Sequence, residues 1–179
     1  MMSLAPTPLV SGLTGLSTAT LREWTSRREL IPADVRPRKK GSPAQYSWQT
    51  VLILRIAVAL RTQFHVELQA HKSVFDGLRA ALRQRSFISL WGKRLAVAGN
   101  GDWSFTEGTI EDVAIDDAMF IHLDPHLEVI SAGFALPHPQ STLGQLDLFP
   151  VQIAAQSTPA SEPAGDVTEV ALDRRRSVR

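Results

Sequence analysis

The sequence has no cysteine among its 179 residues, which excludes disulfides, thiolate metal sites and cysteine nucleophiles. It also has no hydrophobic run near the roughly 20 residues that a membrane span needs. The first residues lack the basic and apolar segments of a signal peptide. Together with a charged fraction of 21%, these absences predict a cytoplasmic protein that does not associate with membranes.

Motifs of the common enzyme classes are also missing. There is no Gly-rich phosphate loop, no Gly-x-Ser-x-Gly elbow and no cluster of metal-ligand residue types. His122 and His126 have the spacing of helical metal ligands, but Pro125 and strand-like surroundings break the face that this spacing requires. Asp116 and Asp117 are adjacent and would point apart in a strand. We therefore expect no enzymatic activity, no metal and no cofactor.

The two halves of the chain differ strongly in charge, although the net charge is only +1. Residues 1–94 contain 15 Lys/Arg and 5 Asp/Glu, a balance of +10, whereas residues 95–179 contain 4 and 13, a balance of −9. The basic half is suited to a polyanion such as DNA. In the favoured interpretation the basic half binds DNA and the acidic half has a separate role. In the alternative, the acidic half folds back onto the basic half.

The N-terminal segment has the pattern of two short helices around a glycine turn. Gly15 tolerates the positive φ of a tight turn, and Ser17 is a good N-cap, so a helix is expected from about Thr18. A shorter helix with Leu9, Val10 and Leu13 is expected after Pro8. In the second helix the inward side chains are expected to be Ala19, Leu21 and Trp24, and the polar groups suited to phosphates and base edges to be Thr18, Thr20, Arg22, Thr25 and Arg28.

A basic stretch without hydrophobic periodicity follows Pro32. Because Pro37 and Gly41 exclude a long helix there, we expect a β-hairpin-like wing that places cations against a sugar-phosphate backbone. A solvated basic loop is the alternative, but the position directly after a capped helix pair favours DNA contact. The cations of this stretch are Arg36, Arg38, Lys39 and Lys40.

These features together resemble the MerR-type winged helix-turn-helix regulators over residues 8–64. The resemblance implies that the second helix enters the major groove, that the wing flanks it, and that a dimer binds a palindromic promoter site. By position it implies that Arg22 contacts DNA, that Trp24 is a core residue and that Tyr46 reaches phosphate from the wing base. The matching succession is Gly15-Leu16-Ser17, Leu21-Arg22-Glu23-Trp24, Leu30-Ile31-Pro32, the basic stretch, Tyr46-Ser47 and an apolar helix.

The sequence departs from that family at several positions. A Gly usually ends the second helix where Glu29 precedes Leu30, and an Arg commonly stands at the position of Ala44. Lys39 and Lys40 are able to supply the charge that Ala44 lacks.

The rest of the chain predicts two more helices and a β-rich segment. Ser47 is expected to cap a long helix, and residues 66–85 form a second, which suits pairing with a partner subunit. A hairpin is expected around the turn at residues 99–102, followed by another pair of strands at 119–123 and 127–130. Trp91, Trp103 and Phe105 are expected to be core residues, with the wall of an effector pocket as the alternative.

We therefore predict an α+β protein in four segments. These are a MerR-like winged helix-turn-helix domain (1–64), a connecting or dimerisation helix (65–86), a small β-rich dimerisation or interaction module (87–135) and a low-complexity, disordered tail (136–179). The candidate DNA-contacting residues are Thr18, Thr20, Arg22, Arg28, Arg36, Arg38, Lys39, Lys40 and Tyr46.

The predicted function is sequence-specific transcriptional regulation by a homodimer on double-stranded DNA. One alternative is an architectural, recombination-accessory or plasmid-maintenance factor that bends or coats DNA. The other is an adaptor that recruits a protein partner through its C-terminal half, including the acidic-apolar segment 143–149.

Overall fold

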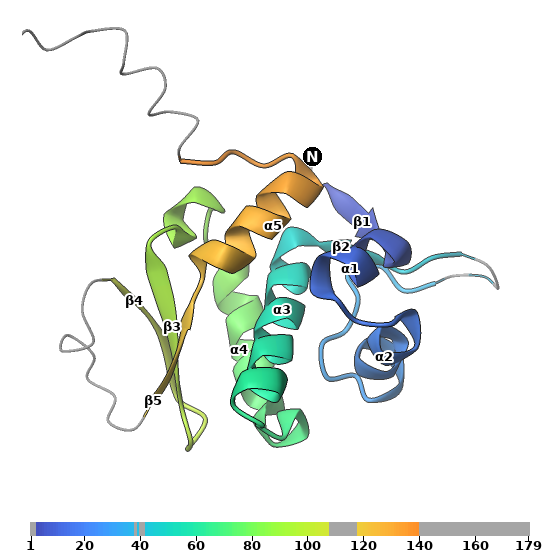
Figure 1. Cartoon of the computed structure of the whole chain (residues 1–179). Coiled ribbons are helices and arrows are strands. Elements are labelled where there is room, and N and C mark those ends of the chain that lie inside the picture. Colours follow the sequence, from blue (N-terminus) through green and yellow to red (C-terminus); the bar gives the residue numbers. More distant parts are fainter. Residues whose placement is uncertain (1–2, 38, 40–41, 108–117, 140–179) are drawn as a thin grey trace, which may run out of the picture. The chain divides into compact units, whose positions relative to one another are not determined.

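The computed structural model describes residues 3–37, 39, 42–107 and 118–139. All of them belong to the compact unit Met1–Leu148 (Figure 1). The predicted tail lies outside the described residues from position 140 onward. None of the helices in the described ranges is both long and apolar enough to cross a membrane.

Helices and two small antiparallel sheets make up this unit, so the predicted α+β class is confirmed for the part of the chain that the structure describes. The strands are β1 (Leu4–Pro6), β2 (Gln45–Ser47), β3 (Lys93–Ala98), β4 (Trp103–Glu107) and β5 (Ala118–His122). The α-helices are α1 (Thr7–Thr14), α2 (Thr18–Arg22), α3 (Trp48–Gln63), α4 (Lys72–Arg83) and α5 (Asp124–Phe134). Shorter helical turns are η1 (Glu23–Arg27), η2 (Leu68–His71) and η3 (Ile88–Leu90).

The end of α1 and the start of α2 are determined by neighbouring residues, as the sequence predicts. Gly15 ends α1 with a φ of 71°, and its N–H donates to the carbonyl of Ser11 at 3.0 Å. The side chain of Ser17 accepts the N–H of Thr20 at 3.1 Å, so α2 begins at Thr18. Both the glycine turn and the serine cap are confirmed.

A π-helical turn, η1, continues α2 without a break and changes which side chains are buried. The N–H of Arg28 donates to the carbonyl of Glu23 at 2.9 Å, a bond that spans five residues. Leu21 and Trp24 are buried as predicted. Two predictions are wrong: Ala19 is exposed, and Thr25 is 3% exposed with its hydroxyl donating to the carbonyl of Leu21. The wider π turn rotates each residue less than an α turn, so adjacent Trp24 and Thr25 both face inward.

Helix α3 is the central element of the core. Ser47 caps it by accepting the N–H of Thr50, which confirms the predicted start. Ten of its 16 residues are buried, because α1, α4 and α5 all pack on it (Figure 1). The helix predicted at 66–85 is α-helical only over α4, since η2 precedes it as a 3-10 turn.

The second sheet has the order β4-β3-β5, with β3 paired antiparallel to both neighbours. The β3–β4 hairpin confirms the predicted turn at 99–102. Trp103 of β4 lies against Gly77 of α4, where an added Cβ would lie 2.9 Å from the indole nitrogen. Trp103 and Phe105 pack against the core, as does Trp91, whose partly buried ring meets Phe87 edge-to-face at 6.2 Å.

The strand predicted at 127–130 is wrong, because these residues belong to α5. Pro125 lies in the first turn of α5, where its fixed φ and missing N–H are tolerated. Leu127, Ile130 and Phe134 then follow helical steps of three and four and are buried.

One cluster of buried apolar side chains extends from Ala5 to Phe134. It therefore continues across the predicted segment boundaries at 64 and 86. Helices α5 and α1 approach closely at Gly133, where an added Cβ would lie 2.6 Å from a methyl group of Leu13.

Candidate nucleic-acid interface

The exposed face of α2 carries Thr18 and Arg22, which are four residues apart and so share one side of the helix. Thr20 is half-buried, and its hydroxyl lies 2.9 Å from that of Ser17, so it takes part in the helix cap. None of the ion pairs among the described residues involves Arg22. This guanidinium is therefore available to an anionic ligand.

A backbone bridge closes the basic loop, which we define as residues 36–44. The N–H of Val35 donates to the carbonyl of Gln45, and the N–H of Gln45 donates to the carbonyl of Val35, both at 3.0 Å. Lys39 is exposed at the turn, where its carbonyl accepts the N–H of Ser42. Arg38 and Lys40 lie outside the described residues. The loop thus has a hairpin-like base, as the sequence predicts.

A cleft of about 460 Å³ separates the basic loop from α2 and η1. Two guanidinium groups, those of Arg22 and Arg27, border it. None of the described residues that line the cleft carries a carboxylate. The hydroxyl-bearing residues that line it are Thr7, Thr18, Ser26 and Ser42, together with Tyr46, whose side chain is almost fully buried.

Arg27 and two of the candidate cations, Arg28 and Arg36, form ion pairs within the protein. The Arg27 Nη1 lies 3.4 Å from Glu23 Oε2. The Arg28 Nε lies 3.0 Å from Glu23 Oε1, and the hydrogen bond from Arg28 holds the pKa of Glu23 below its usual value. The Arg36 Nη2 lies 2.8 Å from Glu29 Oε1. All of these side chains are solvent-accessible, so the pairs are screened by water. A phosphate is able to compete with either carboxylate.

Tyr46 does not reach the surface, so the prediction that it contacts phosphate is wrong. Its side chain is 1% exposed, and its hydroxyl lies 3.4 Å from the hydroxyl of Thr25. The cause is the pairing of β2 with β1, in which Tyr46 lies opposite Ala5 and both residues are buried. Successive strand residues point to opposite faces, and Tyr46 takes the inward one.

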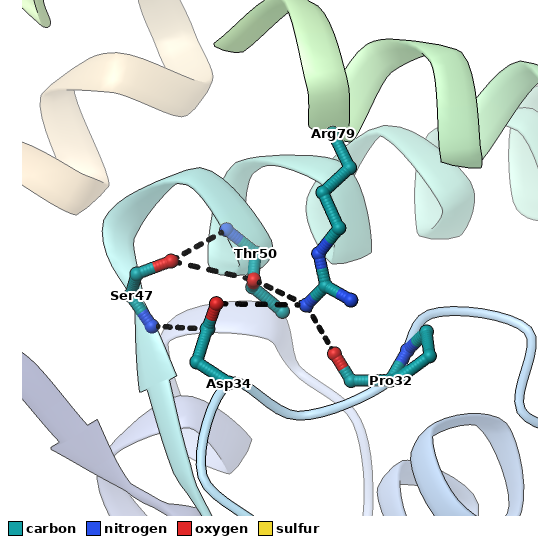
Figure 2. Close-up of polar contacts among 5 residues, drawn as sticks. All are labelled: Pro32, Asp34, Ser47, Thr50 and Arg79. Atoms are coloured by element: carbon teal, nitrogen blue, oxygen red, sulfur yellow. Dashed lines mark hydrogen bonds and ion pairs between the residues drawn. The ribbon is translucent and has the colours of Figure 1, made fainter. Parts of the chain in front are cut away.

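A polar network that the sequence analysis missed holds the segment before the basic loop (Figure 2). The Arg79 Nη2 of α4 donates to the carbonyl of Pro32 and, at 2.9 Å, to the hydroxyl of Thr50. It also lies 3.6 Å from Asp34 Oδ1, while Asp34 Oδ2 accepts the N–H of Ser47 at 2.7 Å. Burial lowers the pKa of Arg79, and the charge of Asp34 opposes that shift.

No local signal in the sequence marks Arg79. It is one of several basic residues on the amphipathic helix α4, and its partner Pro32 is 47 residues away in the chain. Only the packing of α4 against α3 brings them together.

His122 and His126, which have the spacing of helical metal ligands, lie in different elements, β5 and α5. Within the described residues, no group of three or more His, Asp or Glu side chains is placed to hold a metal ion.

Comparisons of the chain with family models, with curated proteins and with solved structures found no match.

Proposed function

We propose that this protein is a sequence-specific DNA-binding transcriptional regulator with a MerR-like winged helix-turn-helix. The observation that carries the proposal is the cleft between α2 and the basic loop, which Arg22, Arg27 and several hydroxyl groups line without any carboxylate among the described lining residues. Guanidinium and hydroxyl groups are the usual protein donors to DNA phosphates and base edges.

In this proposal α2 is the recognition helix. Thr18 and Arg22 face outward together and would contact base edges in the major groove, since an arginine fork matches the paired acceptors of guanine. Thr20 would contribute through the cap that fixes the start of the helix, because the first residues of a recognition helix are the ones that enter the groove.

The basic loop would act as the wing. Lys39 is exposed there, and Arg36 needs only to leave Glu29 to pair with phosphate. Arg38 and Lys40 belong to the same stretch of sequence. Each phosphate that these cations neutralise releases condensed counterions, so the wing would supply affinity that depends strongly on salt.

We further propose that the active form is a homodimer on a palindromic site. The support is the family resemblance of residues 8–64, in which two recognition helices reach half-sites about one helical turn of DNA apart.

The test is capture of genomic DNA fragments by the purified protein at two salt concentrations, followed by binding titrations on the captured site and on a random duplex. Arg22→Ala should weaken the captured site by about 10- to 100-fold and the random duplex much less. Lys39→Ala should weaken both duplexes alike and reduce the salt slope by about 1.

Arg85→Ala is the control, since Arg85 stacks over Phe105 rather than lining the cleft. An equal loss on both duplexes for Arg22→Ala would contradict its role in base recognition. Several phased sites with bending of the DNA, instead of one inverted repeat, would indicate an architectural factor.

A further inference from the structure

We propose that Arg79 of α4 is a positioning residue for the basic loop, which it holds in the geometry that binds DNA. This inference rests on the proposed function. According to this inference, a residue of α4 sets the conformation of the basic loop, although α4 is distant from the loop in the sequence.

The first support is the convergence of three acceptor groups, from two segments of the chain, on one nitrogen atom. The Arg79 Nη2 contacts the carbonyl of Pro32, the carboxylate of Asp34 and the hydroxyl of Thr50 (Figure 2). Pro32 and Asp34 precede the basic loop, whereas Thr50 lies in the first turn of α3, just after it. One side chain therefore ties both ends of the loop to α4.

The second support is the double use of Asp34. While its Oδ1 faces Arg79, its Oδ2 accepts the N–H of Ser47, the residue that caps α3. The carboxylate therefore ties the segment before the loop, to which Asp34 belongs, to β2, which follows the loop. The Val35–Gln45 bridge lies immediately beside these contacts.

The third support is burial. The side chains of Arg79 and Asp34 are only 17% and 22% exposed, so solvent screens this pair much less than it screens the pair of Arg36 with Glu29. The other charged groups near Arg79 are Arg83 and Asp76, both on α4 itself. Hydrogen bonds from a charged donor in such a setting are among the stronger ones in proteins. Losing Arg79 leaves Asp34 without its cation and the carbonyl of Pro32 without this donor.

When Arg79 is substituted, we expect the basic loop to lose the preorganised conformation in which it binds DNA. A loop with a fixed base presents its cations to the DNA backbone without first having to be ordered. A loop with a loose base must be ordered during binding, and that entropy cost weakens affinity.

The experiment compares Arg79→Gln and Arg79→Lys with the control Arg83→Gln. Arg83 lies one turn further along α4 and borders the same small cavity of about 140 Å³, but its side chain takes part in none of the side-chain hydrogen bonds or ion pairs among the described residues. Amide hydrogen exchange is measured by NMR at Val35 and Gln45, with the amide of Ile56 in the middle of α3 as the internal reference. Affinity is measured by fluorescence anisotropy on the captured duplex and on a random duplex of equal length.

Arg79→Gln should speed exchange at Val35 and Gln45 by at least about tenfold while leaving Ile56 unchanged, and should weaken DNA binding by about tenfold. Arg79→Lys keeps the charge near Asp34 and should recover part of both effects, whereas Arg83→Gln should leave exchange at the bridge unchanged.

Unchanged exchange at the bridge, unchanged DNA affinity, or acceleration at Ile56 to the same extent would overturn the proposal, the last because Arg79 would then support the whole fold. If the unmutated protein binds neither duplex, the proposed function fails, and the exchange data still decide whether Arg79 holds the loop.

Discussion

The hydroxyl of Tyr46 lies 3.4 Å from the hydroxyl of Thr25, and neither side chain is more than 3% exposed. This contact joins β2 to η1 beneath the cleft. It connects the strand that leaves the basic loop with the turn that continues the proposed recognition helix, so the two sides of the cleft share one buried base.

Tyr46→Phe should therefore affect stability slightly and DNA binding not at all. Thr25 retains its bond to the carbonyl of Leu21 at 2.8 Å, so the change removes only one long hydrogen bond. The expected loss in the free energy of unfolding is about 0.5–1 kcal/mol, measured by urea denaturation. The salt dependence of DNA binding should stay the same. A smaller salt slope would mean that the phenol contacts phosphate after all.

Glu29 has a φ of 47°, a left-handed conformation that glycine adopts at lower cost. Glu29→Gly and Glu29→Ala both remove the carboxylate that pairs with Arg36. The difference between their free energies of unfolding therefore reports the cost of the left-handed backbone conformation at position 29. The glycine variant should be more stable than the alanine variant by about 1 kcal/mol in thermal or urea unfolding. Equal stabilities would show that position 29 bears no conformational strain.

Both Glu29 variants should also bind DNA more tightly than the unmutated protein, because Arg36 is released. The gain should shrink as salt rises, which a salt titration of affinity measures.

The lowered pKa of His126 predicts that the protein loses stability in acid. Burial, together with the nearby charge of Arg55, lowers its pKa from 6.5 to about 4. Between these values the unfolded chain binds the proton and the folded chain does not. The contribution of this histidine is therefore complete above pH 6.5 and is lost as the pH falls toward 4.

After allowance for partial exposure, the loss should be on the order of 1–2 kcal/mol. The measurement is the free energy of unfolding in urea at pH 7 and at pH 4.5, for the unmutated protein and for His126→Gln. The variant should lose less stability over this range. Carboxylates with lowered pKa values, those of Glu23 and Glu107, titrate in both proteins and cancel in the comparison. Parallel losses would place the histidine in a solvated site.

Features governed by neighbouring residues were predictable from the sequence. Gly15 and Ser17 fix the turn before α2, and Ser47 fixes the start of α3, because each acts on backbone groups within a few positions. The closed base of the basic loop was also predictable, since Pro37 and Gly41 exclude a helix between two ordered segments.

Features set by long-range packing were not predictable. Tyr46 faces inward because β2 pairs with β1, a strand of three residues that ends in Pro6 and is too short to leave a pattern. The short, mostly apolar segment at 127–130 fits a strand or a helix equally well, and Pro125 lies in the first turn of the helix that the structure shows there. Arg79 becomes important only through partners distant in the chain.

The close approach of Gly133 to Leu13 has a consequence for how the chain folds during synthesis. The second residue of this contact leaves the ribosome 120 positions after the first, so α1 emerges long before α5 exists to cover it. The apolar surface of α1 that α5 covers in the folded protein therefore stays exposed to solvent until α5 has been synthesised. During that time the nascent chain is able to bind chaperones or to aggregate through this surface.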